Sequence, residues 1–132
     1  MSENSQINEQ EVWRFIFERI ETVPHLEALL LIWENRPRNW SADELAQRLY
    51  VDRKIALALL QDLARQGLIV ADSSSSERYF YESRTDENDK LLAAVQTKYR
   101  TQIVAVSTMI HRKASLAIRD FADAFRFTKE NR

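Results

Sequence analysis

The sequence predicts a mainly α-helical domain that carries one small β-hairpin. Three observations predict this class. Apolar residues recur at helical spacing through most of the chain, two short runs of strand type flank a polar tip, and a capping signal and the only glycine bracket the helical segment before those runs. With 132 residues, of which 45% are hydrophobic and 30% charged, the chain can bury a single core of ordinary size.

Two helices are expected in the first 35 residues. The first runs from Gln10 to about Glu21 and has an apolar stripe. The stripe consists of Val12, Trp13, Ile16, Phe17 and Ile20. The second helix runs from His25 to Asn35, and Pro24 occupies its first turn, where the missing backbone donor does no harm. Its apolar positions are Leu26, Leu29, Leu30 and Trp33.

A pair of helices is expected next, between Ser41 and Gly67. Ser41 followed by Glu44 forms a capping box, in which the hydroxyl and the carboxylate satisfy backbone donors of the first turn. Asp52 suits the N-cap of the second helix of the pair. Gly67 follows the last periodic residue, as a left-handed C′ position requires.

A β-hairpin is expected directly after Gly67. Its strands are predicted at residues 68–70 and 78–81, because these short runs are apolar and aromatic. The tip between them, residues 71–77, is polar and contains four consecutive serines. Two helices joined by a tight turn and followed by a hairpin make a winged helix-turn-helix layout.

The C-terminal part is expected to form two helices. The longer one, roughly Asp86 to Arg112, has apolar residues spaced by three or four positions, a narrow seam suited to pairing with another helix. The basic group at residues 111–113 is interpreted as the end of that helix, and a last helix is expected from about Ser115 to Phe127. We predict a homodimer, because the terminal helices carry more apolar and aromatic surface than a small core needs. The predicted interface residues are Trp13, Ile16, Phe17, Tyr99, Ile103, Val106 and Ile110.

The pattern ADELAQRL…VD…ALALLQDLARQGLIV resembles the winged helix-turn-helix superfamily, and especially the bacterial MarR-like regulators. The match covers about a third of the chain. The resemblance implies a DNA-binding transcriptional regulator, in which the helix from Arg53 to Gln66 enters the major groove and the terminal helices interlock in a dimer. Length and composition predict a flexible tail (1–8) and a single domain (9–132). The domain comprises an N-terminal helix (9–23), a winged unit (24–83) and C-terminal helices (84–132).

The acidic balance of the winged unit leaves both DNA binding and protein binding open as functions. Residues 41–83 hold five Lys/Arg against seven Asp/Glu, whereas affinity for double-stranded DNA comes largely from cations that neutralise phosphates. The candidate DNA contacts are Arg53, Lys54, Gln61 and Arg78. The alternative is a winged-helix module that binds another protein and no DNA, with Leu57 and Ala58 as the outward contact face.

Catalysis and cofactor binding find no support in the sequence. The chain has no cysteine, and His25 and His111 are far apart without a metal-ligand spacing, so neither a metal site nor an enzyme is expected. One glycine cannot build a phosphate-binding loop. The longest apolar runs are six residues, far short of a membrane helix, and the N-terminus lacks the features of a signal peptide. We therefore expect a cytoplasmic protein with no cofactor.

Overall fold

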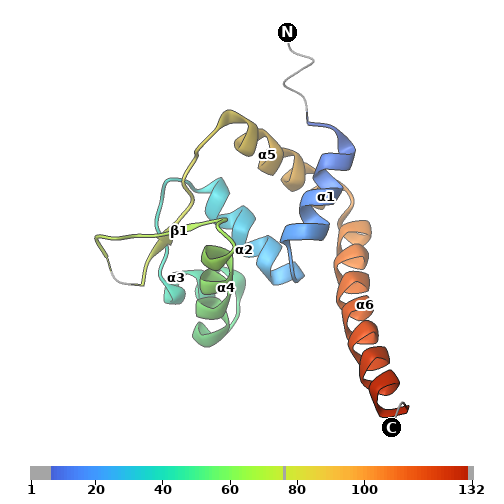
Figure 1. The fold of residues 1–132 in the computed structure, drawn as a ribbon. Coiled ribbons are helices and arrows are strands. Elements are labelled where there is room, and N and C mark those ends of the chain that lie inside the picture. Colours follow the sequence, from blue (N-terminus) through green and yellow to red (C-terminus); the bar gives the residue numbers. More distant parts are fainter. Residues whose placement is uncertain (1–6, 76, 131–132) are drawn as a thin grey trace.

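The computed structural model describes the backbone of residues 7–75 and 77–130, and the side chains of residues 7–75 and 77–116 (Figure 1). Within these ranges the chain is mainly helical, with one antiparallel hairpin, as the sequence predicts. The elements in order are α1 (Glu9–Arg19), α2 (Val23–Glu34), α3 (Ala42–Leu49), α4 (Arg53–Arg65), β1 (Val70–Ala71), β2 (Tyr79–Phe80), α5 (Asp86–Thr101) and α6 (Ile103–Glu130).

Helices α3 and α4 form the predicted helix-turn-helix pair. The capping box is present: the Ser41 hydroxyl accepts from the Glu44 backbone N–H at 3.2 Å, and the Glu44 carboxylate accepts from the Ser41 N–H at 3.1 Å. Asp52 stands at the N-cap of α4 as expected, but its side chain makes no capping hydrogen bond. Gly67 ends the unit with a φ of +77°, the left-handed conformation predicted from its position.

The hairpin is short and is attached to the helical pair by a third extended segment. Val70 pairs with Phe80 and Ala71 pairs with Tyr79. Trp40, which immediately precedes the capping box of α3, exchanges two backbone hydrogen bonds with Tyr79, of 2.7 and 3.0 Å. The wing therefore leaves the body of the protein at a fixed position beside the start of α3.

One apolar cluster joins the helices and the hairpin. Helix α2 lies at its centre and packs against α3, α4 and α5, while α1 packs against α5 and α6. The largest side chains with no more than 1% of their surface exposed are Trp40, Ile16, Ile20, Leu26, Leu29, Ile32, Leu45, Leu60, Leu63, Ile110, Val95 and Val106. This core fixes α4 by its inner face and leaves the opposite face of α4 at the surface.

The predicted single helix from Asp86 to Arg112 is wrong. The chain breaks at Gln102, whose φ of −134° and ψ of 52° are not helical, and α5 and α6 are separate helices that pack against each other. The break lets both halves of the apolar seam turn toward the same core. Val95 of α5 and Val106 of α6 are each 0% exposed, so the seam is filled by the subunit itself and not by a partner helix.

The expected boundary near residue 113 is also wrong, because α6 continues without interruption to Glu130. Lys113 does not end its own helix. Its ammonium group donates to the carbonyl oxygens of Phe17 at 2.5 Å and Ile20 at 2.7 Å, and so stabilises the C-terminus of α1. Figure 1 shows α6 running past the end of α1 and away from the rest of the fold. The aromatic residues at positions 121, 125 and 127, part of the aromatic surface on which the predicted dimer rests, lie outside the described side chains.

Candidate nucleic-acid interface

The outer face of α4 is the candidate reading surface. Its buried face consists of Ala56, Leu59, Leu60 and Leu63. On the opposite side Lys54, Ala58 and Gln61 follow at intervals of four and three residues, and all three side chains are exposed. Lys54 has no ion-pair partner among the described residues. One ammonium, one methyl and one amide group are therefore presented together on one side of a helix.

Arg53, another candidate DNA contact, is paired with acids. Its guanidinium lies 3.1 Å from the Asp43 carboxylate of α3 and 3.3 Å from the Glu77 carboxylate of the hairpin tip. All three side chains are more than half exposed. Exposed pairs of this kind contribute about 0–1 kcal/mol each, so the guanidinium can exchange its partners for another anion at little cost.

Arg78 is engaged by side chains of the same chain. It donates from one nitrogen to both carboxylate oxygens of Glu44, at 2.9 and 3.0 Å, and from another to the Asn39 side chain at 3.0 Å. The Ser41 backbone N–H, followed by Arg78, holds the pKa of Glu44 below its usual value. These contacts tie the base of the wing to the N-terminus of α3 and direct the Arg78 side chain toward the protein.

The wing tip is organised by an acidic residue. Asp72 accepts hydrogen bonds from the Ser74 backbone N–H at 2.9 Å, the Ser74 hydroxyl at 2.7 Å and the Asn39 amide at 2.7 Å. These donors lower the pKa of Asp72, the Ser74 hydroxyl having the largest effect. Glu77 stands on the other side of the tip, so the described part of the tip carries acids and hydroxyls where a minor groove would favour cations.

The structure corrects the predicted apolar contact face. Ala58 is exposed as expected, but Leu57 is half-buried and packs against the core. The exposed apolar groups are instead Ile55, 46% exposed on α4, and Tyr50, 94% exposed in the turn between α3 and α4. Tyr50 holds a φ of +59°, which non-glycine residues seldom adopt. No local sequence signal marks Tyr50 as exposed, because its orientation follows from this turn conformation.

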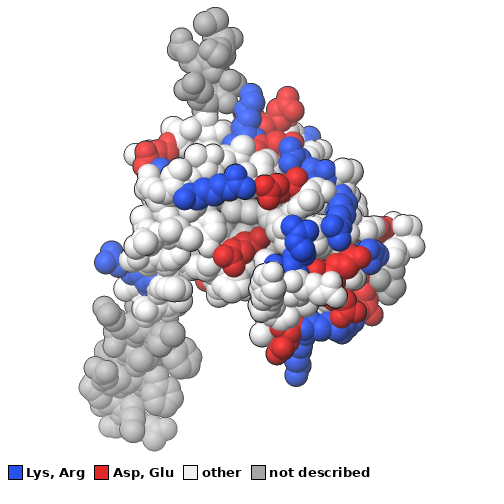
Figure 2. Space-filling model, turned by 180° about the vertical axis from the view of Figure 1, so that it is seen from behind, with Lys and Arg blue, Asp and Glu red and all other residues white. Residues whose placement is uncertain are grey.

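Figure 2 shows how charge is spread over one face of the molecule. Blue cationic and red acidic side chains lie interspersed there, and the cations do not form one continuous surface. At the helix-turn-helix unit, the ion pairs of Arg53 and Arg78 likewise place an acid beside each cation, so these cations do not form a continuous positive surface. The predicted basic residues are brought near one another, but two of the three cations face acids of the same chain.

The seven predicted interface residues have different environments. Within the single subunit, Ile16, Val106 and Ile110 are at most 1% exposed, so their burial needs no partner. Trp13 and Tyr99 are half-buried. The Tyr99 hydroxyl donates to the Glu27 carboxylate at 2.9 Å. Burial, followed by this contact with Glu27, raises the pKa of Tyr99 to about 12. Phe17 and Ile103 remain 48% and 52% exposed.

Comparisons with known proteins add little to this description. No family model matches the chain, and no curated protein matches it. Among solved structures, it is similar to the heme sensor protein PefR from Streptococcus agalactiae in complex with heme. That alignment has a TM-score of 0.48 and 13% sequence identity, and it covers 88% of this chain and 82% of the other. At this distance the likeness carries no argument about a ligand or a target.

None of the described helices combines the length and the apolar character needed to cross a lipid bilayer.

Proposed function

We propose that this protein is a DNA-binding transcriptional regulator that places α4 in the major groove. The observation that carries the proposal is the position of α4: one face is locked into the core, and the other presents Lys54, Ala58 and Gln61 beside the wing. A helix of 13 residues is about 20 Å long. Its diameter with side chains, about 10–12 Å, matches the width of the major groove, about 12 Å. These features support the winged helix-turn-helix mode that the sequence resemblance implies.

The three exposed side chains suit base edges and phosphates. The Gln61 amide can donate to and accept from an adenine at once, and the Ala58 methyl can contact the methyl group of thymine. Lys54, near the N-terminus of α4, can reach either a guanine edge or a phosphate. The arrangement therefore favours sequence reading over general attraction to DNA.

Phosphate contacts are expected to be few. Arg53 becomes available by exchanging Asp43 and Glu77 for a phosphate, at the small cost of breaking exposed ion pairs. Arg78 is held by a two-oxygen contact with Glu44, and we assign it the role of positioning the wing. Weak dependence of affinity on salt follows from this count.

We further propose that the protein acts as a homodimer, in the bacterial cytoplasm. Apolar side chains remain exposed along α6 and the facing end of α1. They are Phe17, Ile103, Val104 and Leu116, between 42% and 75% exposed. A second copy packed there would bury them and present two α4 helices, as recognition of a paired half-site requires.

A protein partner is the second candidate, and one observation favours it. Tyr50, in the turn before α4, and Ile55, on α4, are exposed apolar side chains, while Arg53 of the same helix is paired with acids. Aromatic and aliphatic side chains surrounded by polar groups are typical of protein contact sites. Ile55→Glu should abolish such a contact and leave Lys54 and Gln61 free to bind DNA.

The test is selection of binding sites from a pool of random DNA duplexes, followed by fluorescence anisotropy on the selected site. Gln61→Ala should weaken binding to that site by about 1–3 kcal/mol and relax preference at one base pair, because a base contact is lost. Lys54→Ala should weaken binding as well. The matched control is Lys90→Ala, which removes an exposed lysine from α5 and should bind like the wild type. Equal binding by all four proteins would refute the role of α4.

A further inference from the structure

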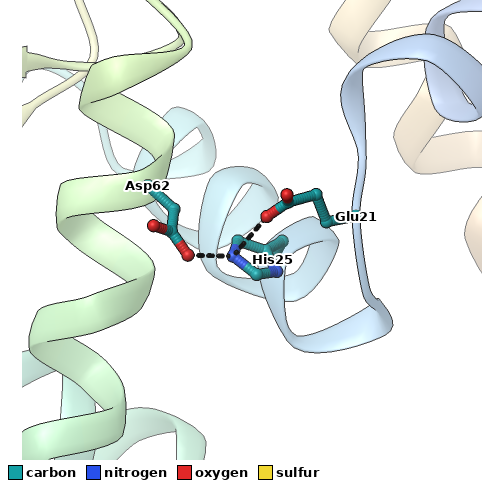
Figure 3. Close-up of side chains that lie close together, drawn as sticks. All are labelled: Glu21, His25 and Asp62. Carbon is teal, nitrogen blue, oxygen red and sulfur yellow. Dashed lines mark hydrogen bonds and ion pairs between the residues drawn. The ribbon is translucent and has the colours of Figure 1, made fainter. Parts of the chain in front are cut away.

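Three side chains outside the DNA-reading face converge on one point. His25 lies in the first turn of α2 and is 9% exposed, Glu21 lies in the link before that helix, and Asp62 belongs to α4 (Figure 3). The His25 Nε2 atom is 2.9 Å from an Asp62 oxygen and 3.6 Å from a Glu21 oxygen. Two carboxylates from distant parts of the chain therefore lie close to the same imidazole nitrogen.

The other nitrogen of the ring is also occupied. His25 Nδ1 lies 2.6 Å from the Thr22 hydroxyl, which caps α2. When Nδ1–H donates to that hydroxyl, the Nε2 lone pair points at the two carboxylates. Two carboxylates and a lone pair repel one another, and a cation between them removes that repulsion. A second hydrogen bond that fixes the ring in this way is what metal-binding histidines usually have.

The distances suit a small divalent cation. Zn²⁺ binds His nitrogen and carboxylate oxygen at about 2.0–2.2 Å, which puts neighbouring tetrahedral ligands about 3.4 Å apart. The two distances from Nε2 lie on either side of that value, and all three ligand atoms lie within 4.8 Å of one another. Glu21 is 58% exposed and can adjust its position, and its open side leaves room for a water as fourth ligand.

The remaining charges around the cluster leave it able to accept a cation. Arg65 donates to the second oxygen of Asp62 at 2.9 Å, so it orients that carboxylate and leaves the oxygen facing His25 free. Arg65 itself is 71% exposed. Lys113 also attracts the Glu21 carboxylate without forming an ion pair with it, so two cations accompany the two carboxylates, but neither occupies the carboxylate oxygens that face His25.

We propose that Glu21, His25 and Asp62 form a binding site for one divalent transition-metal ion, with Zn²⁺ as the best match to one nitrogen and two oxygen ligands. The bound ion fastens α4 to the corner between α1 and α2. Any effect of the ion on DNA binding rests on the function proposed above, whereas metal binding itself does not.

The test is titration of the metal-free full chain with ZnCl₂, followed by calorimetry and thermal unfolding. The proposal predicts one ion per chain and a rise of at least about 5 °C in Tm at a hundredfold excess over Kd, because the ion binds the folded state. His25→Gln and Asp62→Asn should abolish both effects. Glu21→Gln, a change at an exposed side chain that should not disturb folding, should weaken binding at least about tenfold.

His111→Gln is the matched control, because it removes the exposed histidine on α6 and should bind Zn²⁺ like the wild type. Absence of one-to-one binding by the wild type would overturn the proposal and leave the cluster as a hydrogen-bonded link between helices. Equal Zn²⁺ affinity of wild type and Glu21→Gln would overturn it as well. If the protein binds Zn²⁺ but no DNA, the proposed DNA-binding function is refuted and the proposed metal site is not.

Discussion

Val106 and Ile103 lie one turn apart on α6, and the structure predicts opposite consequences when each is shortened to alanine. Val106 is 0% exposed in the single subunit, and Ile103 is 52% exposed. Val106→Ala removes two carbon atoms from a filled core. At about 0.8 kcal/mol for each buried carbon, with a further contribution from the cavity left behind, the free energy of unfolding should fall by about 2 kcal/mol.

For a chain of 132 residues, about 1 kcal/mol corresponds to roughly 4 °C in Tm, so Val106→Ala should unfold about 8 °C below the wild type. Ile103→Ala should change subunit stability much less than Val106→Ala, because about half of Ile103 is already exposed to water. It should weaken the proposed dimer, for which the wild type has twice the 15.5 kDa chain mass.

Thermal unfolding by circular dichroism and mass by light scattering distinguish the two effects. The two variants serve as controls for each other, since both shorten an apolar side chain of the same helix to alanine. The reasoning is refuted if Val106→Ala unfolds at the wild-type temperature, or if Ile103→Ala is the variant that loses about 2 kcal/mol in urea unfolding of the isolated subunit.

Three further predictions concern single contacts. Gly67→Ala should cost about 1 kcal/mol from backbone strain, because φ is +77° and no atom lies within 4 Å of the new Cβ; an unchanged thermal midpoint would contradict this. Glu44→Gln should flatten the loss of stability in acid. The pKa of Glu44 is lowered by Ser41 and Arg78, so its contribution is present above the unfolded pKa and is lost as pH falls through the folded one; parallel unfolding curves between neutral pH and pH 3 would argue against it. Lys113→Met should lower the free energy of unfolding by about 1–2 kcal/mol, since the C-terminal carbonyls of α1 lose a charged donor, and a urea midpoint equal to that of wild type would exclude this role.

The features that the sequence predicts well are those with local causes. The capping box of Ser41 and Glu44 joins residues three apart, and Gly67 ends its helix through its own backbone freedom. Both signals lie in a few neighbouring residues, so no knowledge of the tertiary structure is needed to interpret them. The helix-turn-helix pair follows from them, and the hairpin follows from the short apolar and aromatic runs on either side of a polar tip.

The features that the sequence misses depend on the tertiary structure. No glycine or proline marks the break at Gln102; the chain bends there because α5 and α6 both pack against α1. The same packing takes Val106 and Ile110 out of the expected dimer seam. Leu57 is half-buried because the core extends around the side of α4 that the helical pattern places outward.

The candidate sites show the same limit. Arg78 reaches Glu44 across 34 residues of sequence, and no local signal in the sequence marks this contact. Asp62 lies 37 residues from His25, so spacing along the chain gives no hint of the cluster that they form with Glu21. Only the packing of α4 against α2 brings these two side chains together.

The central claim is that α4 binds DNA with few phosphate contacts, and its most direct test is the salt dependence of affinity. Binding to the selected duplex should be measured for wild type and Arg53→Ala at several salt concentrations. The account predicts a shallow slope of log K against log salt for the wild type and a slope reduced by about 0.9 for the variant, because one phosphate contact is lost. If the wild type shows no salt-dependent association with any duplex at about 50 mM salt, where phosphate contacts are strong, DNA binding is not its function.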